Sequence, residues 1–198
     1  AVDPPANPLP SRAAQRAVAT GGTHTDVRIR DLFERFLPHD KRVKRLGTTV
    51  KPDQILAIPG NVAAGRTLFL KAAGVQCRNC HRIARQGKAV GPDLDTIARK
   101  NDRRAILESI LTPSKKIDPK FRAYLVETTQ GRVHTGLLVS RTDKRVVIRE
   151  ANGKETVVTA DDVEMIVAQP KSLMPELLVK DMTSKQLADL LAFLESLK

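Results

Sequence analysis

The residues with the clearest chemistry are two cysteines followed by a histidine: Cys77, Cys80 and His81. They form the sequence Cys-x-x-Cys-His, and the chain has two cysteines in total. This spacing is the attachment pattern of c-type haem, in which each thiol bonds to one vinyl group of the ring. The histidine then binds the iron as its proximal ligand. The sequence therefore predicts one covalently attached haem c.

Three other uses of the cysteine pair explain fewer of these residues. A thioredoxin-like dithiol belongs near a βαβ pattern and does not require His81. A structural zinc site usually has four Cys or His ligands, and the sequence has no second Cys-x-x-Cys pair and no His-x₃₋₅-His pair. A simple disulfide between Cys77 and Cys80 leaves the histidine unexplained. Haem attachment accounts for all of these residues.

A distal iron ligand is predicted at Met174, which is followed directly by Pro175 and shortly afterwards by a helical pattern. A thioether ligand opposite histidine raises the reduction potential of the haem. The alternative is that Met174 only fills space in the core, as methionines often do. Met165 lies in a strand pattern and Met182 lies at the entrance of the last helix, so both rank below Met174.

The remaining histidines, His24, His39 and His134, are expected at the surface. A bis-histidine site that pairs His81 with His39 or His134 is a second alternative to the His/Met pair. We favour Met174, because the proline and the helix that follow it are the context in which such a ligand is found.

Helical patterns surround the haem attachment sequence. Residues 62–73 follow Asn61, a favourable N-cap. Further helices are predicted over 102–111 and after Thr183, which is the predicted N-cap of the last helix. In residues 121–168 the apolar period changes from helical to alternating. Four or five short antiparallel strands are expected there, forming a small twisted sheet or partial barrel.

Composition and pattern divide the chain into five segments. They are a flexible leader or linker (1–26), an N-terminal helical strap (27–58), the first part of the haem domain (59–120), a β-rich insertion (121–168), and the methionine loop with the C-terminal helix (169–198).

The net positive charge of the chain is concentrated in its N-terminal part. The formal net charge is +12, and residues 1–120 carry 23 Lys and Arg against 11 Asp and Glu, whereas residues 121–198 carry 11 of each. Such a basic field favours association with an acidic partner, although it is also consistent with a generally basic surface. Nucleic acid binding is disfavoured, because one tyrosine and five phenylalanines give little for base stacking and no nucleic-acid motif is present.

The sequence shows neither a secretory signal at its start nor an apolar run long enough to span a bilayer. Haem c is attached outside the bacterial cytoplasm. We therefore expect a periplasmic or otherwise extracytoplasmic location, either for a mature chain or for a piece of a longer secreted protein.

These features resemble the class I cytochromes c. The matching features are Gly65, Phe69, Cys77-x-x-Cys80-His81, Gly91-Pro92-x-Leu94, Met174-Pro175 and Phe193. The resemblance implies a mainly α fold in which the first and last helices cross at Gly65, with a small antiparallel β-sheet inserted between the third helix and the methionine loop. It also implies that the Pro92 carbonyl accepts a hydrogen bond from His81 and that Leu94 contacts the haem.

A narrower resemblance covers residues 27–198. The strap, the insertion and the Ser172-Leu-Met-Pro175 ending are similar to the C-terminal haem-binding domain of large secreted planctomycete and verrucomicrobial proteins, the Pirellula/Verrucomicrobium type. In that family the domain commonly follows a β-propeller, a dehydrogenase-like region and helical repeats. By that resemblance, residues 1–26 are an interdomain linker.

The function that follows is a one-electron carrier rather than an enzyme. It would exchange electrons with a redox partner, a fused or separate periplasmic dehydrogenase with an acidic docking surface. The alternative is a peroxidase-like haem enzyme or a diatomic gas sensor, in which Met174 is a labile or absent ligand. The insertion would then shape a distal pocket, and an arginine or His134 would act on the bound peroxide or diatomic molecule. The inserted sheet is also considered as a docking surface for the parent protein.

Overall fold

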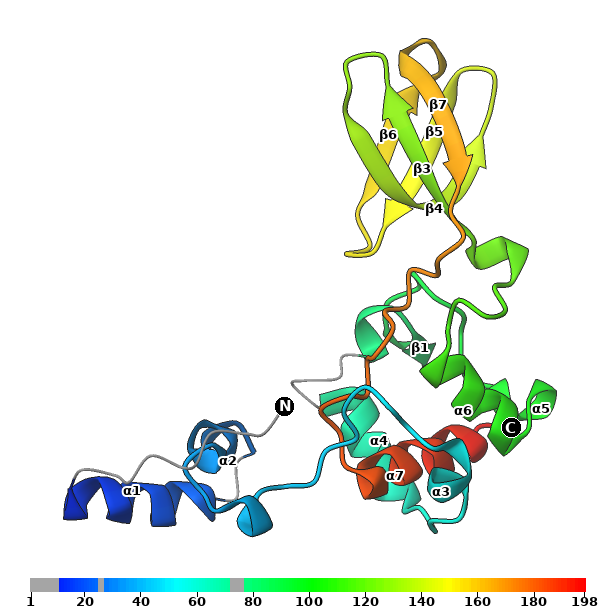
Figure 1. Cartoon of the computed structure of the whole chain (residues 1–198). Coiled ribbons are helices and arrows are strands. Elements are labelled where there is room, and N and C mark those ends of the chain that lie inside the picture. The colour runs from blue at the N-terminus through cyan, green and yellow to red at the C-terminus, as the bar shows by residue number, and fades with distance from the viewer. Residues whose placement is uncertain (1–10, 25–26, 72–76) are drawn as a thin grey trace. The chain divides into compact units, whose positions relative to one another are not determined.

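The computed structural model describes residues 11–24, 27–71 and 77–198 (Figure 1). The chain divides into two compact units, with the boundary between Lys44 and Arg45. Helices hold 39% and strands 20% of the described residues. The prediction of a mainly α fold with a small β insertion is therefore wrong. The main strands pair into a five-stranded sheet with a hydrophobic cluster of its own, so the sheet is more than a small insertion in a helical fold.

The N-terminal unit contains α1 (Arg12–Gly22), α2 (Val27–Glu34) and the short 3-10 helix η1 (His39–Lys41). Helix α1 lies inside the segment that the sequence analysis treats as a flexible leader. Ser11 caps it by accepting a hydrogen bond from the amide of Ala14 at 3.2 Å, and alanines fill its body. The ring of Phe33 lies against Gly21, so α1 and α2 pack together.

The haem attachment sequence lies in the helical part of the second unit. Its helices are α3 (Pro52–Leu56), α4 (Val62–Lys71), the 3-10 helix η2 (Cys77–Asn79), α5 (Ile97–Lys100), α6 (Arg103–Leu111) and α7 (Ser184–Glu195), and a small hairpin joins β1 (Arg82–Ile83) to β2 (Gln86–Gly87). Asn61 caps α4, and Thr183 forms a capping box with Gln186 at α7, so both predicted N-caps are confirmed.

Helices α4 and α7 pack against each other at Gly65. A Cβ atom on Gly65 would lie 2.0 Å from the carbonyl oxygen of Asp189, which shows how closely the two backbones approach. The rings of Phe69 and Phe193 meet beside this crossing with centroids 5.9 Å apart. The predicted glycine crossing is confirmed, and α4 also contacts η2, in which Cys77 lies.

Residues 123–168 form a five-stranded antiparallel sheet in the order β6-β5-β4-β3-β7 (Figure 1). Its strands are β3 (Ala123–Thr128), β4 (Val133–Arg141), β5 (Arg145–Glu150), β6 (Glu155–Thr159) and β7 (Val163–Ala168), with the 3-10 helix η4 (Ala160–Asp162) before the last; η3 (Pro119–Phe121) precedes the first. Val126, Val146, Ile148 and Val158 form its buried cluster. Asn152 and Gly153 lie in the turn between β5 and β6, where Gly153 has a φ of +86°.

The turn between β1 and β2 is strained. Its residues Ala84 and Arg85 have φ of +47° and +64°, a region that costs a residue with a Cβ about 1–2 kcal/mol. We expect Ala84→Gly to stabilise the protein by about 0.5–1 kcal/mol after the entropy cost of glycine is subtracted. Urea unfolding midpoints measure this change. The exposed Ala89 has no positive φ, so Ala89→Gly should shift the midpoint the other way; equal shifts would contradict the strain.

Candidate functional site

An apolar cavity lies beside the attachment sequence in the helical part of the second unit. Its empty space is about 620 Å³, open mouth included. The lining residues are Phe69, Cys77, His81, Leu94, Ile97, Asn101, Ile106, Ser109, Ile110, Met174, Leu178, Val179, Leu190 and Leu194. The structure thus brings together four predicted site residues from distant parts of the chain: Cys77, His81, Leu94 and Met174.

The cysteines sit in a tight bend that opens with η2. The amides of Cys80 and His81 donate to the carbonyl of Cys77 at 3.1 and 2.9 Å, which closes the bend and keeps the two cysteines near each other. Both cysteines are free thiols. Burial raises the pKa of Cys77 to about 11. Burial also raises the pKa of Cys80, and the positive charge of Lys88 partly offsets that rise. The thiols are therefore neutral at pH 7 before any bond to a ring is made.

The ring of His81 is oriented by the loop that follows the bend. Its Nδ1 atom lies 2.8 Å from the carbonyl oxygen of Pro92, as the resemblance implied. Because a carbonyl only accepts hydrogen bonds, Nδ1 carries the proton and Nε2 is left with a free lone pair for a metal. Burial lowers the pKa of His81, which favours the neutral ring that ligation requires.

Glycine at position 91 is required by the packing of this ring. A Cβ atom there would lie 2.7 Å from Cε1 of His81 and 3.0 Å from Nδ1. The main chain therefore runs directly beside the imidazole, and the Pro92 carbonyl follows at once. Gly91 and Pro92 act together on the orientation of His81.

The segment that carries Met174 is held by serine side chains. The Met174 amide donates to Oγ of Ser172 at 3.1 Å, and the Ser172 amide donates to Oγ of Ser114 at 3.2 Å. Met165 on β7 is 42% exposed, and Met182 is buried in the core outside the cavity lining. Met174 is thus the one methionine of the described residues that lines the cavity.

The other histidines lie elsewhere. His134 is on β4, where Nδ1 is 3.5 Å from a carboxylate oxygen of Glu150, and His24 and His39 belong to the N-terminal unit. Within residues 11–24, 27–71 and 77–198, no cluster of three or more His, Cys, Asp and Glu side chains is arranged to hold a metal ion. The structure therefore offers no support to the zinc alternative.

Sequence reasoning missed several residues around the cavity. Asn101 and Ser109 are the neutral polar residues among its lining side chains, and Ser114 supports the methionine segment across a gap of 58 residues. Asn101 borders the helix predicted over 102–111 and Ser109 lies within it, and neither residue belongs to a motif. The contact of Ser114 joins two segments that no local pattern links.

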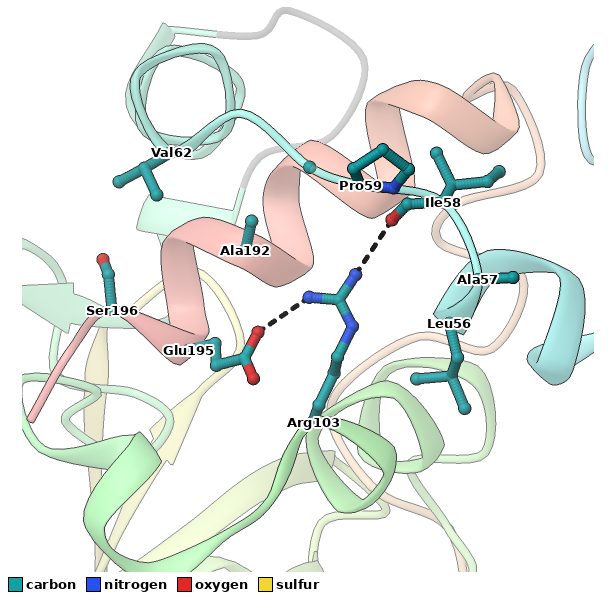
Figure 2. A pocket seen from close by; sticks show the side chains of 10 residues that line it. Leu56, Ala57, Ile58, Pro59, Val62, Arg103, Ala192, Glu195 and Ser196 are labelled. Carbon is teal, nitrogen blue, oxygen red and sulfur yellow. Dashed lines mark hydrogen bonds and ion pairs between the residues drawn. The ribbon is translucent and has the colours of Figure 1, made fainter.

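A second, more open pocket lies on the side of α7 near residues 56–60 (Figure 2). The guanidinium of Arg103 spans it, with an ion pair to Glu195 at 2.7 Å and a hydrogen bond to the carbonyl of Ile58 at 3.2 Å. Because these groups pair with one another, Arg103 ties α6 to α7 and to the 56–60 segment. The polar groups of this pocket therefore hold elements of the fold together.

The cavity residues fit a covalently attached haem. The walls are almost entirely apolar, and the thiol of Cys77, the neutral imidazole of His81 and the thioether of Met174 line the same space, with Cys80 three residues along the bend from Cys77. These are the donors and the surroundings that a c-type haem requires.

Residues 62–137 match the family model of cytochrome c. No curated protein matches the chain. The matched region begins with α4 and includes the attachment sequence, His81, Pro92 and Leu94, while Met174 lies beyond it. This match supports a c-type cytochrome domain in this part of the chain, and covalently attached haem c is the cofactor of that family.

Proposed function

We propose that the chain is an electron-transfer module that carries one electron at a time on a single haem, with His81 and Met174 as the axial ligands. One observation carries this proposal: the side chains of His81 and Met174 line the same apolar cavity. Bound haem supplies a one-electron Fe(III)/Fe(II) couple.

Each residue of the site has a distinct role in this proposal. Cys77 and Cys80 hold the ring, and the Pro92 carbonyl keeps Nε2 of His81 free for the iron. Met174 supplies a soft neutral donor that favours the ferrous form. The apolar wall excludes water, which raises the electrostatic cost of charge on the ferric side and so also favours reduction.

The partner and the location are part of the proposal. Arg78, Arg85 and Lys88 are exposed beside the attachment bend, which suits an acidic docking surface on a fused or separate periplasmic dehydrogenase. In the part of the chain that the structure describes, no helix is long and apolar enough to cross a membrane. The resemblance to the planctomycete and verrucomicrobial domain stays a prediction.

The alternative of a haem enzyme or gas sensor requires an open or labile distal position. The cavity lining contains Met174 and does not contain His134, which favours the carrier. The test is the absorption spectrum of the protein, oxidised and reduced, with carbon monoxide added to the reduced sample. We expect a low-spin spectrum with the methionine-to-iron charge-transfer band and no carbon monoxide binding. A high-spin spectrum with rapid carbon monoxide uptake would overturn the proposal.

Gly91→Ala is expected to raise the reduction potential. The new methyl group would displace the His81 ring from the Pro92 carbonyl, and an imidazole without this acceptor donates less charge to Fe(III). A tenfold shift of the one-electron equilibrium corresponds to about 59 mV, and we expect a rise of that order. Pro92→Ala keeps the backbone carbonyl and is the matched control. Equal potentials for the two variants would contradict this role of Gly91.

A further inference from the structure

The loop 88–92 follows β2 and is hydrogen-bonded to the bend that carries Cys77 and Cys80. The Lys88 amide donates to the carbonyl of Arg78 at 2.9 Å. The amides of Val90 and Gly91 both donate to the carbonyl of Cys80, at 3.0 and 2.7 Å. With Gly91 beside the His81 ring and Pro92 as its acceptor, the position of this loop determines the orientation of the imidazole.

The five-stranded sheet holds the other side of the same loop. Nη1 of Arg149, near the end of β5, donates to the carbonyl of Ala89 at 3.0 Å. Nζ of Lys88 donates to the carbonyl of Asn152 in the β5–β6 turn at 2.8 Å. The same turn lies over Val90, which is only 3% exposed although it is in a loop: a Cβ on Gly153 would be 3.7 Å from Cγ2 of Val90.

The guanidinium of Arg149 is itself fixed. Its Nε and Nη2 atoms both donate to a carboxylate oxygen of Glu155 on β6, at 3.0 and 2.6 Å, which leaves Nη1 directed at Ala89. A planar guanidinium satisfies both partners at once, which an ammonium group does not. The contact joins residues 60 positions apart, so it exists only when the sheet is folded and docked.

From these contacts we infer that Arg149 is a positioning residue for the proximal ligand His81 and that the sheet sets the reduction potential of the haem through loop 88–92. This inference rests on the proposed function for its redox consequence. A docked sheet holds the Pro92 carbonyl on Nδ1 of His81 and keeps the imidazole electron-rich. Loss of the contact loosens the loop, weakens this hydrogen bond and favours the ferrous form.

The test compares Arg149→Ala with Arg145→Ala in the full holoprotein. Arg145 lies on the exposed start of the same strand, so the control removes the same charge from the same sheet. We expect Arg149→Ala to shift the one-electron equilibrium toward Fe(II) by up to tenfold, a rise of about 59 mV, and Arg145→Ala to leave it unchanged. Arg149→Lys should behave like the alanine variant, because one ammonium group does not replace a planar guanidinium that donates to Glu155 and to the Ala89 carbonyl at once.

A second measurement separates this inference from the proposed function. Amide hydrogen exchange at Val90 and Gly91 reports the two bonds to Cys80 whatever the haem does, and we expect it to be about tenfold faster in Arg149→Ala. Faster exchange in a protein that lacks the His/Met spectrum would support the positioning role of Arg149 and would contradict the proposed electron-carrier function. Exchange rates and a potential equal to those of Arg145→Ala would overturn the inference.

Discussion

Met174→Ala is expected to open the distal position of the haem and to lower its reduction potential. Among the described residues, Met174 is the one methionine that lines the cavity, so no other thioether can replace it. Alanine would therefore leave the sixth coordination position of the iron to water or an added ligand. Axial ligands set haem potentials over a range of roughly 0.8 V, and we expect a fall on the order of 0.1 V or more. Redox titration and carbon monoxide binding to the reduced variant measure both effects.

Two companion variants separate ligation from packing. Met182 is buried at 4% exposure in the core, so Met182→Ala should cost about 2–5 kcal/mol of stability while the spectrum stays that of the parent. Met174→Leu keeps the apolar volume but removes the sulfur, and should match Met174→Ala in its spectrum. If Met174 only packs, its alanine variant will lose stability and retain the parent spectrum, as Met182→Ala does.

Gly65→Ala is expected to destabilise the protein strongly, although alanine is the better helix former. By propensity alone the change would stabilise α4 by about 1 kcal/mol. The added Cβ would lie 2.0 Å from the Asp189 carbonyl oxygen and 2.8 Å from Cβ of Phe193, and neither atom moves without its backbone. Separating α4 from α7 loosens the contact of Phe69 with Phe193, so we expect a net loss of roughly 2–3 kcal/mol.

The control for this prediction is Ala63→Gly on the exposed face of α4. It changes propensity without touching α7 and should cost about 1 kcal/mol. Chemical denaturation of both variants gives the comparison. A midpoint that rises in Gly65→Ala would mean that the helices do not approach as closely as the structure has them.

The parts of the structure that the sequence predicted well are those whose causes are local. Asn61 and Thr183 cap helices through atoms within three residues, so their helices start where the pattern indicates. The attachment bend is likewise contained in five consecutive residues. Helix α1 was missed because alanine and glycine give no apolar period, although Ser11 and the alanines suffice to start and fill a helix.

The parts that were missed depend on contacts between distant residues. The alternating pattern in 121–168 showed strands, but whether they form an appendage or a body with its own core depends on how Val126, Val146 and Ile148 meet. The contact of Arg149 with Ala89 spans 60 residues and has no periodic counterpart in either segment. The Ala84-Arg85 turn was hidden because neither residue is a usual choice for positive φ.

Strands β3 and β7, which are the first and last strands of the sheet along the chain, lie next to each other in the sheet. Tyr124 pairs with Ala168, and the Gln169 amide donates to the carbonyl of Ala123 at 2.8 Å. The chain therefore enters and leaves the sheet about one strand spacing apart, roughly 5 Å. Because these two ends are neighbours, a change in the length of the strands or turns inside the sheet leaves the separation of its ends, and so the path from α6 to Met174, unchanged.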